Sequence, residues 1–203
     1  MPTPRIRDKE PVMAWLPEPD PATVPEVTET FERVQKSRGW VSNLMRSLAH
    51  APEGLHRYAA LGHYCRYMTE LTEVQRELVI CIVGRHIPYA ATHHGGLALQ
   101  IGITEAQLQS IKADRTPPDL AAAERALCDY VFAFASFKGI PKPVRAAIQR
   151  HFSPRQITDI GLIASYYLAA GSLIMAHDVQ IEPPEVLQIE LDWQRRTMEG
   201  GGG

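Results

Sequence analysis

The sequence predicts an all-α protein that folds as a single compact helical domain of about eight or nine helices, preceded by a proline-rich N-terminal arm. Its 203 residues are 45% hydrophobic, which suits one domain with a sizeable core. Helix-start signals recur along the chain. The segment that most resembles a strand, LVICIV at residues 78–83, has no partner run with which to form a sheet, so we expect it to be a buried helix.

The N-terminal arm is predicted from its prolines, which cannot lie in a helix interior. We expect residues 1–22 to be extended, either loose or wrapped around the domain or a neighbouring subunit, with Trp15 and Leu16 as anchors. The helical domain then covers residues 23–183. Residues 184–203 are expected to form a C-terminal tail whose glycine-rich end is flexible. The prolines of the arm region are Pro2, Pro4, Pro11, Pro17, Pro19, Pro21 and Pro25.

The helices are predicted from their first residues. A hydroxyl side chain followed three positions later by Glu or Gln can satisfy free backbone amides at both positions. Such pairs are Thr23 with Glu26, Thr72 with Gln75, Thr104 with Gln107 and Ser153 with Gln156, and further starts lie at Pro52, Pro88 and Asp119. The predicted helices span 24–38, 43–49, 52–68, 73–86, 88–101, 105–112, 120–137, 142–152 and 154–177.

Charge and composition exclude several classes of partner. The chain has 21 basic and 23 acidic residues without a long run of one sign, which argues against nucleic acid and anionic membranes. The start, MPTPRIRDKEPV, lacks the apolar segment of a secretory signal, and the run 78–83 is too short to span a bilayer. We therefore expect a soluble, cytoplasmic protein.

The cysteines do not form a recognisable framework. Cys65, Cys81 and Cys128 are widely spaced and include no CxxC pair, which argues against a disulfide scaffold and against a zinc ribbon. Each is expected to be a small buried apolar residue.

The segment 75–96, QRELVICIVGRHIPYAATHHGG, is the candidate active site because it places polar residues in an apolar neighbourhood. Helical periodicity turns Glu77 toward the interior, with Cys81 one turn further on. On the following helix it makes His94 the inward histidine and places His93 on another face with Tyr89. A carboxylate in that interior has a raised pKa unless a cation or donor meets it.

The two predicted helices reverse near Pro88, which brings Glu77 and His94 to similar levels. At a rise of about 1.5 Å per residue they lie about 15 Å and 10 Å from the bend. A Glu and a His so placed can share or relay a proton near neutral pH. A buried Glu–His contact without catalysis is the alternative.

A carboxylate-binding site is predicted at the bend. The helix opening at Pro88 presents free amides, which attract anions, and Arg85 just before it can form a fork on a carboxylate. The alternative is a surface arginine favoured by the helix dipole. A metal site formed by His63, His86, His93 and His94 is not expected, because no spacing such as HExxH supports it.

The order of several segments resembles one superfamily. RELVI, followed by an arginine, a tyrosine and a His-His pair, and preceded by SNLMRSLAHAPEGLHRY, is similar to the carboxymuconolactone decarboxylase-like superfamily, which includes the alkyl hydroperoxidase D-like proteins. YYLAAGSLIMAHDV resembles its final core helix. The resemblance covers residues 24–183. It implies an all-α fold that assembles as a homotrimer or homohexamer, with a site at or near the subunit interface.

The resemblance also separates two chemistries. The peroxidase branch carries CxxCxxxH, but the two cysteine positions fall on Ile87 and Ala90 here, so an alkyl hydroperoxidase-like antioxidant activity is disfavoured. Cys81 lies in the preceding helix without a resolving partner. The decarboxylase branch needs no thiol and, as the resemblance implies, no cofactor.

The sequence therefore predicts a cofactor-independent decarboxylase, lactone isomerase or hydrolase that acts on a small carboxylated lactone or ring-cleavage acid. A non-catalytic oligomeric binding module of the same fold is the alternative. The candidate catalytic residues are Glu77, His94 and His93. The candidate substrate-binding residues are Arg85, Tyr89, His63 and Asn43, with Cys81 and His86 as accessory residues.

Overall fold

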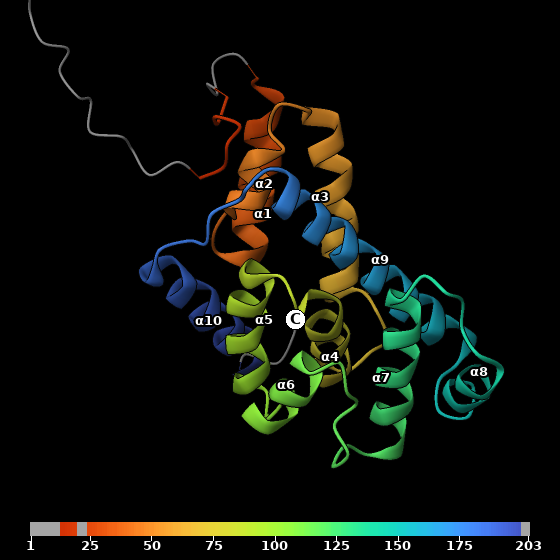
Figure 1. Ribbon diagram of the computed structural model, residues 1–203. Coiled ribbons are helices and arrows are strands. Elements are labelled where there is room, and N and C mark those ends of the chain that lie inside the picture. The colour runs from red at the N-terminus through yellow and green to blue at the C-terminus, as the bar shows by residue number, and fades with distance from the viewer. Residues whose placement is uncertain (1–12, 20–23, 200–203) are drawn as a thin grey trace, which may run out of the picture.

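The computed structural model describes residues 13–19 and 24–199, and within those residues all regular structure is helical (Figure 1). The expected all-α fold is confirmed. The helices are α1 (Glu26–Arg38), α2 (Asn43–Ser47), α3 (Pro52–Tyr67), α4 (Glu73–Gly84), α5 (Pro88–Gln100), α6 (Glu105–Lys112), α7 (Ala122–Ala135), α8 (Lys142–Ile148), α9 (Pro154–Ala176) and α10 (Pro184–Glu199).

Helix α4 is the centre of the domain. It packs against α5, α7 and α9, and Leu78, Val79 and Ile82 are fully buried on it. The segment 78–83 is thus a buried helix, as expected, because its apolar residues are covered by other helices on every side.

Most of the predicted helix starts that the structure describes are observed, but α7 begins at Ala122 and not after Asp119, whose carboxylate accepts a bond from Gln107 instead. Thr72, Thr104 and Ser153 each accept a bond from the amide three residues on, and the side-chain oxygen of the glutamine there accepts a bond from the backbone amide of the cap residue. Thr23 lies outside the described residues. Helix α1 begins after Pro25 without a side-chain cap.

The turn between α4 and α5 reverses the chain within three residues. Helix α4 ends at Gly84 and α5 begins at Pro88, so the two helices run back along one another with α4 behind α5 in Figure 1. They are tightly packed at Gly84, where an added Cβ would lie 2.7 Å from the Cβ of Ala90.

The described part of the arm is fixed to the end of α9. The Trp15 amide donates to the carbonyl of His177 at 3.0 Å, and its indole N–H donates to that of Ala176 at 2.8 Å. The Trp15 side chain is nevertheless 63% exposed, and the buried residue of this segment is Ala14. The N-terminal prolines at positions 2, 4, 11 and 21 lie outside the described residues.

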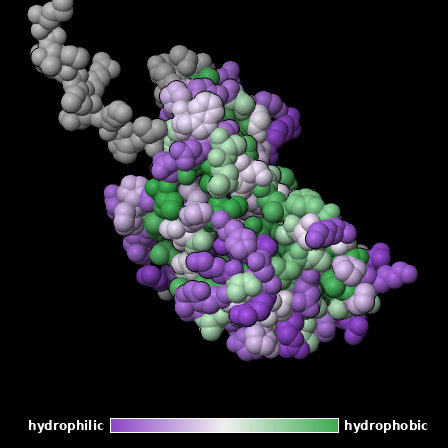
Figure 2. Space-filling model, in the orientation of Figure 1, coloured by the Kyte–Doolittle hydropathy of each residue, from purple (hydrophilic) through white to green (hydrophobic). Residues whose placement is uncertain are grey.

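Helix α9 is the long core helix that the sequence predicts. It packs against α3, α4 and α7. Among the described residues it is also the one helix long and apolar enough to cross a bilayer, although 44% of its apolar window is buried in the protein, as in a core helix. Figure 2 shows apolar surface in the region where Figure 1 draws α9.

Helix α10 was not predicted, since residues 184–203 were expected to form a tail. Its residues 184–199 are helical and pack against α5 and α1. The Leu191 side chain lies over Gly96, where an added Cβ would be 3.3 Å from it, and the Leu191 carbonyl accepts a bond from Gln100. The buried side of this helix also includes Glu190 and Gln194, whose polar groups bond to partners inside the domain.

Replacing Gly84 with alanine should lower the free energy of unfolding by roughly 1–3 kcal/mol, although alanine favours helix more than glycine does. The cause is the α4–α5 contact, because the methyl group of Ala90 cannot rotate away from a new Cβ. Denaturant unfolding measures the change.

Gly54→Ala is the matched control. A Cβ there meets only the Cβ of Ala51 at 3.5 Å, so stability should be unchanged or higher by up to about 1 kcal/mol. Equal stability of Gly84→Ala and the wild type would contradict the close approach.

Candidate active site

Glu77 forms the centre of a buried charge cluster. One carboxylate oxygen, Oε1, accepts a bond from the Arg66 guanidinium, and the other, Oε2, lies 2.9 Å from Nδ1 of His94. Arg66 comes from α3, Glu77 from α4 and His94 from α5. The predicted approach of Glu77 and His94 across the reversed chain is therefore observed, and Arg66 is the cation that meets the carboxylate.

The cluster keeps Glu77 ionised. Burial alone would raise the pKa of this fully buried carboxyl, but the Arg66 guanidinium and the bonded His94 ring outweigh burial and hold the pKa at about 2. An ionised carboxylate can only accept hydrogen bonds. The proton between Glu77 and His94 therefore belongs to His94 Nδ1.

This bond determines what His94 presents to its surroundings. With Nδ1 bonded to Glu77, the other ring nitrogen, Nε2, has no hydrogen-bond partner among the described residues. The His94 ring lines a cavity and meets the Tyr167 ring edge-on, with the two ring centroids 5.1 Å apart. In the neutral ring Nε2 carries a lone pair that can accept a proton.

His93 is held differently, and it is more deeply buried than His94, although periodicity made His94 the inward histidine. Its ring is buried, with Nδ1 2.7 Å from Glu190 Oε2 and Nε2 2.7 Å from Glu182 Oε2. The Trp40 ring stacks on the His93 ring, with the two ring centroids 5.5 Å apart and an interplanar angle of 4°. Helix α10 and the segment before it supply both carboxylates and cover a face that would otherwise be exposed.

The two carboxylates make His93 a cation. Burial alone would lower its pKa, but the bonds to Glu182 and Glu190 raise it from 6.5 to about 9. Glu182 Oε1 also accepts from the Tyr89 hydroxyl at 2.7 Å and from the backbone N–H of Asn43 at 2.6 Å. With both ring nitrogens occupied, His93 is placed to attach α10 to the domain and has no free nitrogen for a substrate.

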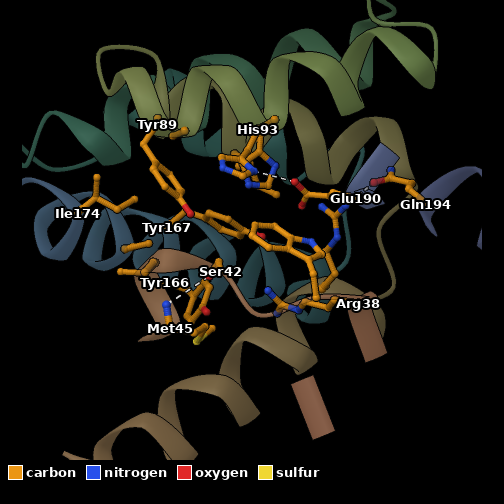
Figure 3. A pocket seen from close by; sticks show the side chains of 18 of the residues that line it. Arg38, Ser42, Met45, Tyr89, His93, Tyr166, Tyr167, Ile174, Glu190 and Gln194 are labelled. Carbon is orange, nitrogen blue, oxygen red and sulfur yellow. Dashed lines mark hydrogen bonds and ion pairs between the residues drawn. The ribbon is translucent and has the colours of Figure 1, made fainter. Parts of the chain in front are cut away.

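A cavity of about 130 Å³ lies beside His94 (Figure 3). Aromatic and aliphatic side chains form much of its wall. In the view of Figure 3, Ile174 and Tyr89 stand at one end, and Arg38 and Gln194 stand at the other. Glu77 is not part of the wall. The lining residues that matter below are Arg38, Trp40, Arg66, His94, Tyr167, Trp193 and Gln194.

Arg85 does not reach this cavity. Its Nε donates to Asp114 Oδ1 at 2.6 Å and its Nη1 to the Ile82 carbonyl at 2.7 Å, and its guanidinium lies over the Phe132 ring. It lines a second cavity of about 300 Å³ between α4, α5 and α6. The predicted carboxylate anchor is thus wrong for the His94 cavity, because an aspartate beyond α6 already pairs with the arginine.

The remaining predicted residues occupy varied places. Tyr89 lines the His94 cavity, with its hydroxyl bonded to Glu182. Asn43 starts α2 and donates from its side chain to the Gln180 carbonyl, so it supports the segment before α10. His63 is exposed beside Tyr67, and His86 is exposed beside Asp114, so neither is brought to the cavity.

Cys81 lines the second cavity, not the one beside His94. Burial, together with the charge of Glu77, raises the pKa of its thiol well above the usual range. Its sulfur lies 3.9 Å from the His94 carbonyl. An activated thiolate needs the opposite environment.

Five residues of the site were not predicted from the sequence: Arg38, Arg66, Glu182, Glu190 and Gln194. Arg66 lies in the last turn of α3 and reaches Glu77 across the connection between α3 and α4, which no local pattern reveals. The acidic residues around Pro183 and Pro184 are a helix-start signal that could have indicated α10. Within residues 13–19 and 24–199, no group of three or more His, Cys, Asp or Glu residues is arranged to hold a metal ion.

Solved structures resemble this fold over most of its length. The match to the debrominase Bmp8 covers 91% of this chain and 98% of the Bmp8 chain, with a TM-score of 0.68 and 16% sequence identity. The match to a peroxidase-related protein from Silicibacter sp. TM1040 covers 88% of this chain and 96% of that protein, with a TM-score of 0.70 and 21% sequence identity. An alkylhydroperoxidase AhpD core protein from Ralstonia eutropha JMP134 covers the same shares (TM-score 0.71, 18% identity).

The fold is therefore that of the AhpD-like proteins, as the sequence resemblance implied. At these identities the likeness concerns the fold alone. The sequence matches no protein-family model and no curated protein.

The His93 contact should make stability depend on pH. Because the folded pKa of about 9 lies above the unfolded value of 6.5, the contribution is fully present below pH 6.5 and is lost as the pH rises through 9. At about 1.4 kcal/mol per pH unit, the contribution is on the order of 3 kcal/mol. The excess stability of the wild type over His93→Gln should shrink by that order between pH 6 and pH 9.5.

Denaturant unfolding at both pH values tests this prediction, since any pH-independent effect of the substitution cancels in the comparison. His151→Gln removes an exposed histidine and serves as the control. A pH-independent difference between the wild type and His93→Gln would contradict a cationic His93.

Proposed function

We propose that the His94 cavity is the active site of an acid–base enzyme, in which Nε2 of His94 transfers the proton. The observation that carries the proposal is the chain of contacts from Arg66 through Glu77 to His94 Nδ1. It fixes the ring, which lines the cavity, and leaves Nε2 without a partner among the described residues. A base whose other nitrogen is bonded to a buried carboxylate is a recurring arrangement for proton transfer.

Glu77 acts in this proposal as a positioning residue. It is fully buried, ionised and absent from the cavity wall, so it does not exchange protons with a substrate. Its charge selects the His94 tautomer with a proton on Nδ1 and stabilises the ring when Nε2 becomes protonated. Arg66 compensates the buried carboxylate and keeps it ionised.

The cavity suits a small ring compound. A protein cavity of about 150 Å³ lined by apolar side chains holds one benzene molecule, and this one measures about 130 Å³. The Bmp8 neighbour was solved, as a variant with a cysteine replaced by alanine, in complex with 2,3,4-tribromopyrrole, a five-membered ring compound. Bmp8 thus supports the proposal that this fold can carry an enzyme activity and bind a small cyclic ligand. Its debromination activity is not proposed for this chain.

The substrate class remains the one the resemblance implies, a small carboxylated lactone or ring-cleavage acid. His94 Nε2 takes a proton from the substrate and returns it at another atom. That transfer is the whole step in an isomerisation. In a decarboxylation, the carbon–carboxylate bond breaks, carbon dioxide leaves, and the electron pair left on carbon takes a proton from Nε2 of the protonated His94 ring, which solvent then reprotonates. The expected trimer or hexamer, the small-molecule partner and the cytoplasmic location belong to the proposal as well.

Two alternatives are less well supported. A thiol peroxidase would need an activated cysteine at the cavity, but Ile87 and Ala90 stand where the peroxidase pattern has thiols. A non-catalytic module would favour a packed interior with His94 bonded to a backbone carbonyl. His94 instead lines a cavity and its ring bonds to Glu77.

His94→Ala should lower kcat by roughly 10²–10⁴-fold on a substrate found in a panel of carboxylated lactones. Glu77→Gln should lower kcat by roughly 10²-fold, because the amide no longer fixes the ring tautomer. Carbon dioxide release and ring absorbance measure turnover.

Far-ultraviolet circular dichroism of both variants distinguishes lost chemistry from lost folding. Wild-type helicity with strongly reduced turnover is the expected result. Full turnover by folded His94→Ala protein would refute the proposal.

Cys81→Ala should leave lactone turnover unchanged within about twofold, because the thiol does not face the His94 cavity. Peroxide consumption with a dithiol reductant should stay at the background rate in both the wild type and this variant. Thiol-dependent peroxide consumption that disappears in Cys81→Ala would contradict the assignment.

A further inference from the structure

Gln194 carries a buried hydrogen-bond donor without a partner. The residue is 7% exposed and lines the His94 cavity, and its Nε2 amide bonds to none of the described residues. Its Oε1 accepts from Arg66 Nη2 at 2.6 Å. Because a guanidinium can only donate, this bond fixes which amide atom is oxygen and which is nitrogen.

An unpartnered donor of this kind calls for an acceptor, because leaving a buried N–H group without a bond is costly. The cavity beside Gln194 is the space from which an acceptor can reach it. A bound molecule that carries an oxygen acceptor at this end would supply the missing bond.

Arg38 adds a positive charge at the same end of the cavity. In Figure 3, Arg38 and Gln194 both lie on the side away from Ile174. Arg38 forms no ion pair with a carboxylate of the described residues, whereas the acidic residues of the cavity wall do have cations: Glu190 pairs with His93 and Glu73 pairs with Arg76. Arg38 is hydrogen-bonded to Tyr166, and its charge also acts on Tyr58, Tyr167, His63 and Cys65.

The rest of the wall is suited to a flat apolar body. Trp40, Tyr166 and Tyr167 contribute rings, and Ile174 closes the other end. The cavity is therefore polar and cationic at one end and apolar at the other, and His94 is part of its wall. A ligand that fits has an anionic oxygen group at one end of a small ring.

We infer that Arg38 and Gln194 together bind the carboxylate of the substrate, with Gln194 Nε2 donating to one carboxylate oxygen and Arg38 balancing the charge. This inference rests on the proposed function for the chemistry at His94, and it replaces Arg85 as the anchor. It makes α10 part of the substrate site, because Gln194 comes from that helix.

A matched pair of ligands tests the carboxylate. Furan-2-carboxylate and furan-2-carboxamide have the same ring and nearly the same shape, but only the first is an anion. Isothermal titration calorimetry on the full chain should show furan-2-carboxylate binding at least about tenfold more tightly than the carboxamide. Equal affinities, or no binding of the carboxylate, would overturn the inference.

Gln194→Glu separates ligand binding from structural support. A glutamate still accepts the Arg66 bond, so stability should be kept, but it presents a carboxylate in place of the Nε2 donor. The Kd for furan-2-carboxylate should rise at least about tenfold, with little change for the carboxamide. Unchanged affinity would mean that Gln194 only supports Arg66, or that a water molecule satisfies its amide.

Arg38→Met keeps the apolar stem and removes the charge, and should weaken carboxylate binding at least about tenfold. Lys36→Met removes the same charge from an exposed site in the last turn of α1 and should not change the Kd. Equal effects of the two variants would indicate a general charge effect and would overturn the role of Arg38.

His94→Ala distinguishes failure of this inference from failure of the proposed function. The variant should lose turnover and keep the wild-type affinity for furan-2-carboxylate within about threefold. Selective carboxylate binding without turnover of any lactone in the panel would refute the acid–base function but leave the anchor standing. Turnover of a lactone with a KM that neither Gln194→Glu nor Arg38→Met changes would support the acid–base function and refute the carboxylate anchor.

Discussion

The buried carboxylate of Glu77 is the constraint on which the rest of the site depends. A charge with no exposure to water survives in a protein interior only if other groups replace its hydration. Here Arg66 and His94 do so, and three helices must meet for both to arrive. Removing one partner of such a cluster typically costs about 3–5 kcal/mol. The same geometry that compensates the charge also fixes the orientation of the His94 ring.

A second ionic cluster holds the outer wall of the cavity. His93 lies between Glu182 and Glu190, and Glu182 is further bonded by Tyr89 and Asn43. The two adjacent histidines of α5 thus have different partners: His94 faces the core helix α4, and His93 faces α10. Arg66 also ties the first cluster to α10, because it bonds both to Glu77 and to Gln194 of that helix.

The parts of this structure that sequence reasoning predicted are those governed by local chemistry. The capping pairs at Thr72, Thr104 and Ser153 fixed three helix starts because both partners lie within one turn. The Glu77–His94 contact was within reach because a short turn at Pro88 makes helix spacing predictable. Arg85 was misassigned because its partner, Asp114, is 29 residues away along the chain.

The missed features depend on tertiary packing. Glu190 and Gln194 lie on the inner side of helix α10, and their partners on α5 and α3 are distant in sequence. The buried position of His93 follows from the same helix, which covers the face of α5 that carries this ring. Polar residues on the buried face of α10 thus make this helix part of the site.

Helix α10 has a consequence for how such a site changes over evolution. The groups that handle the proton are anchored in the central helices, where a substitution disturbs the whole core. The groups inferred to recognise the ligand lie on α1 and α10, at the periphery of the domain. Helix α10 packs mainly against α5 and α1. Specificity can therefore diverge through the terminal helices while the proton-transfer machinery is inherited intact.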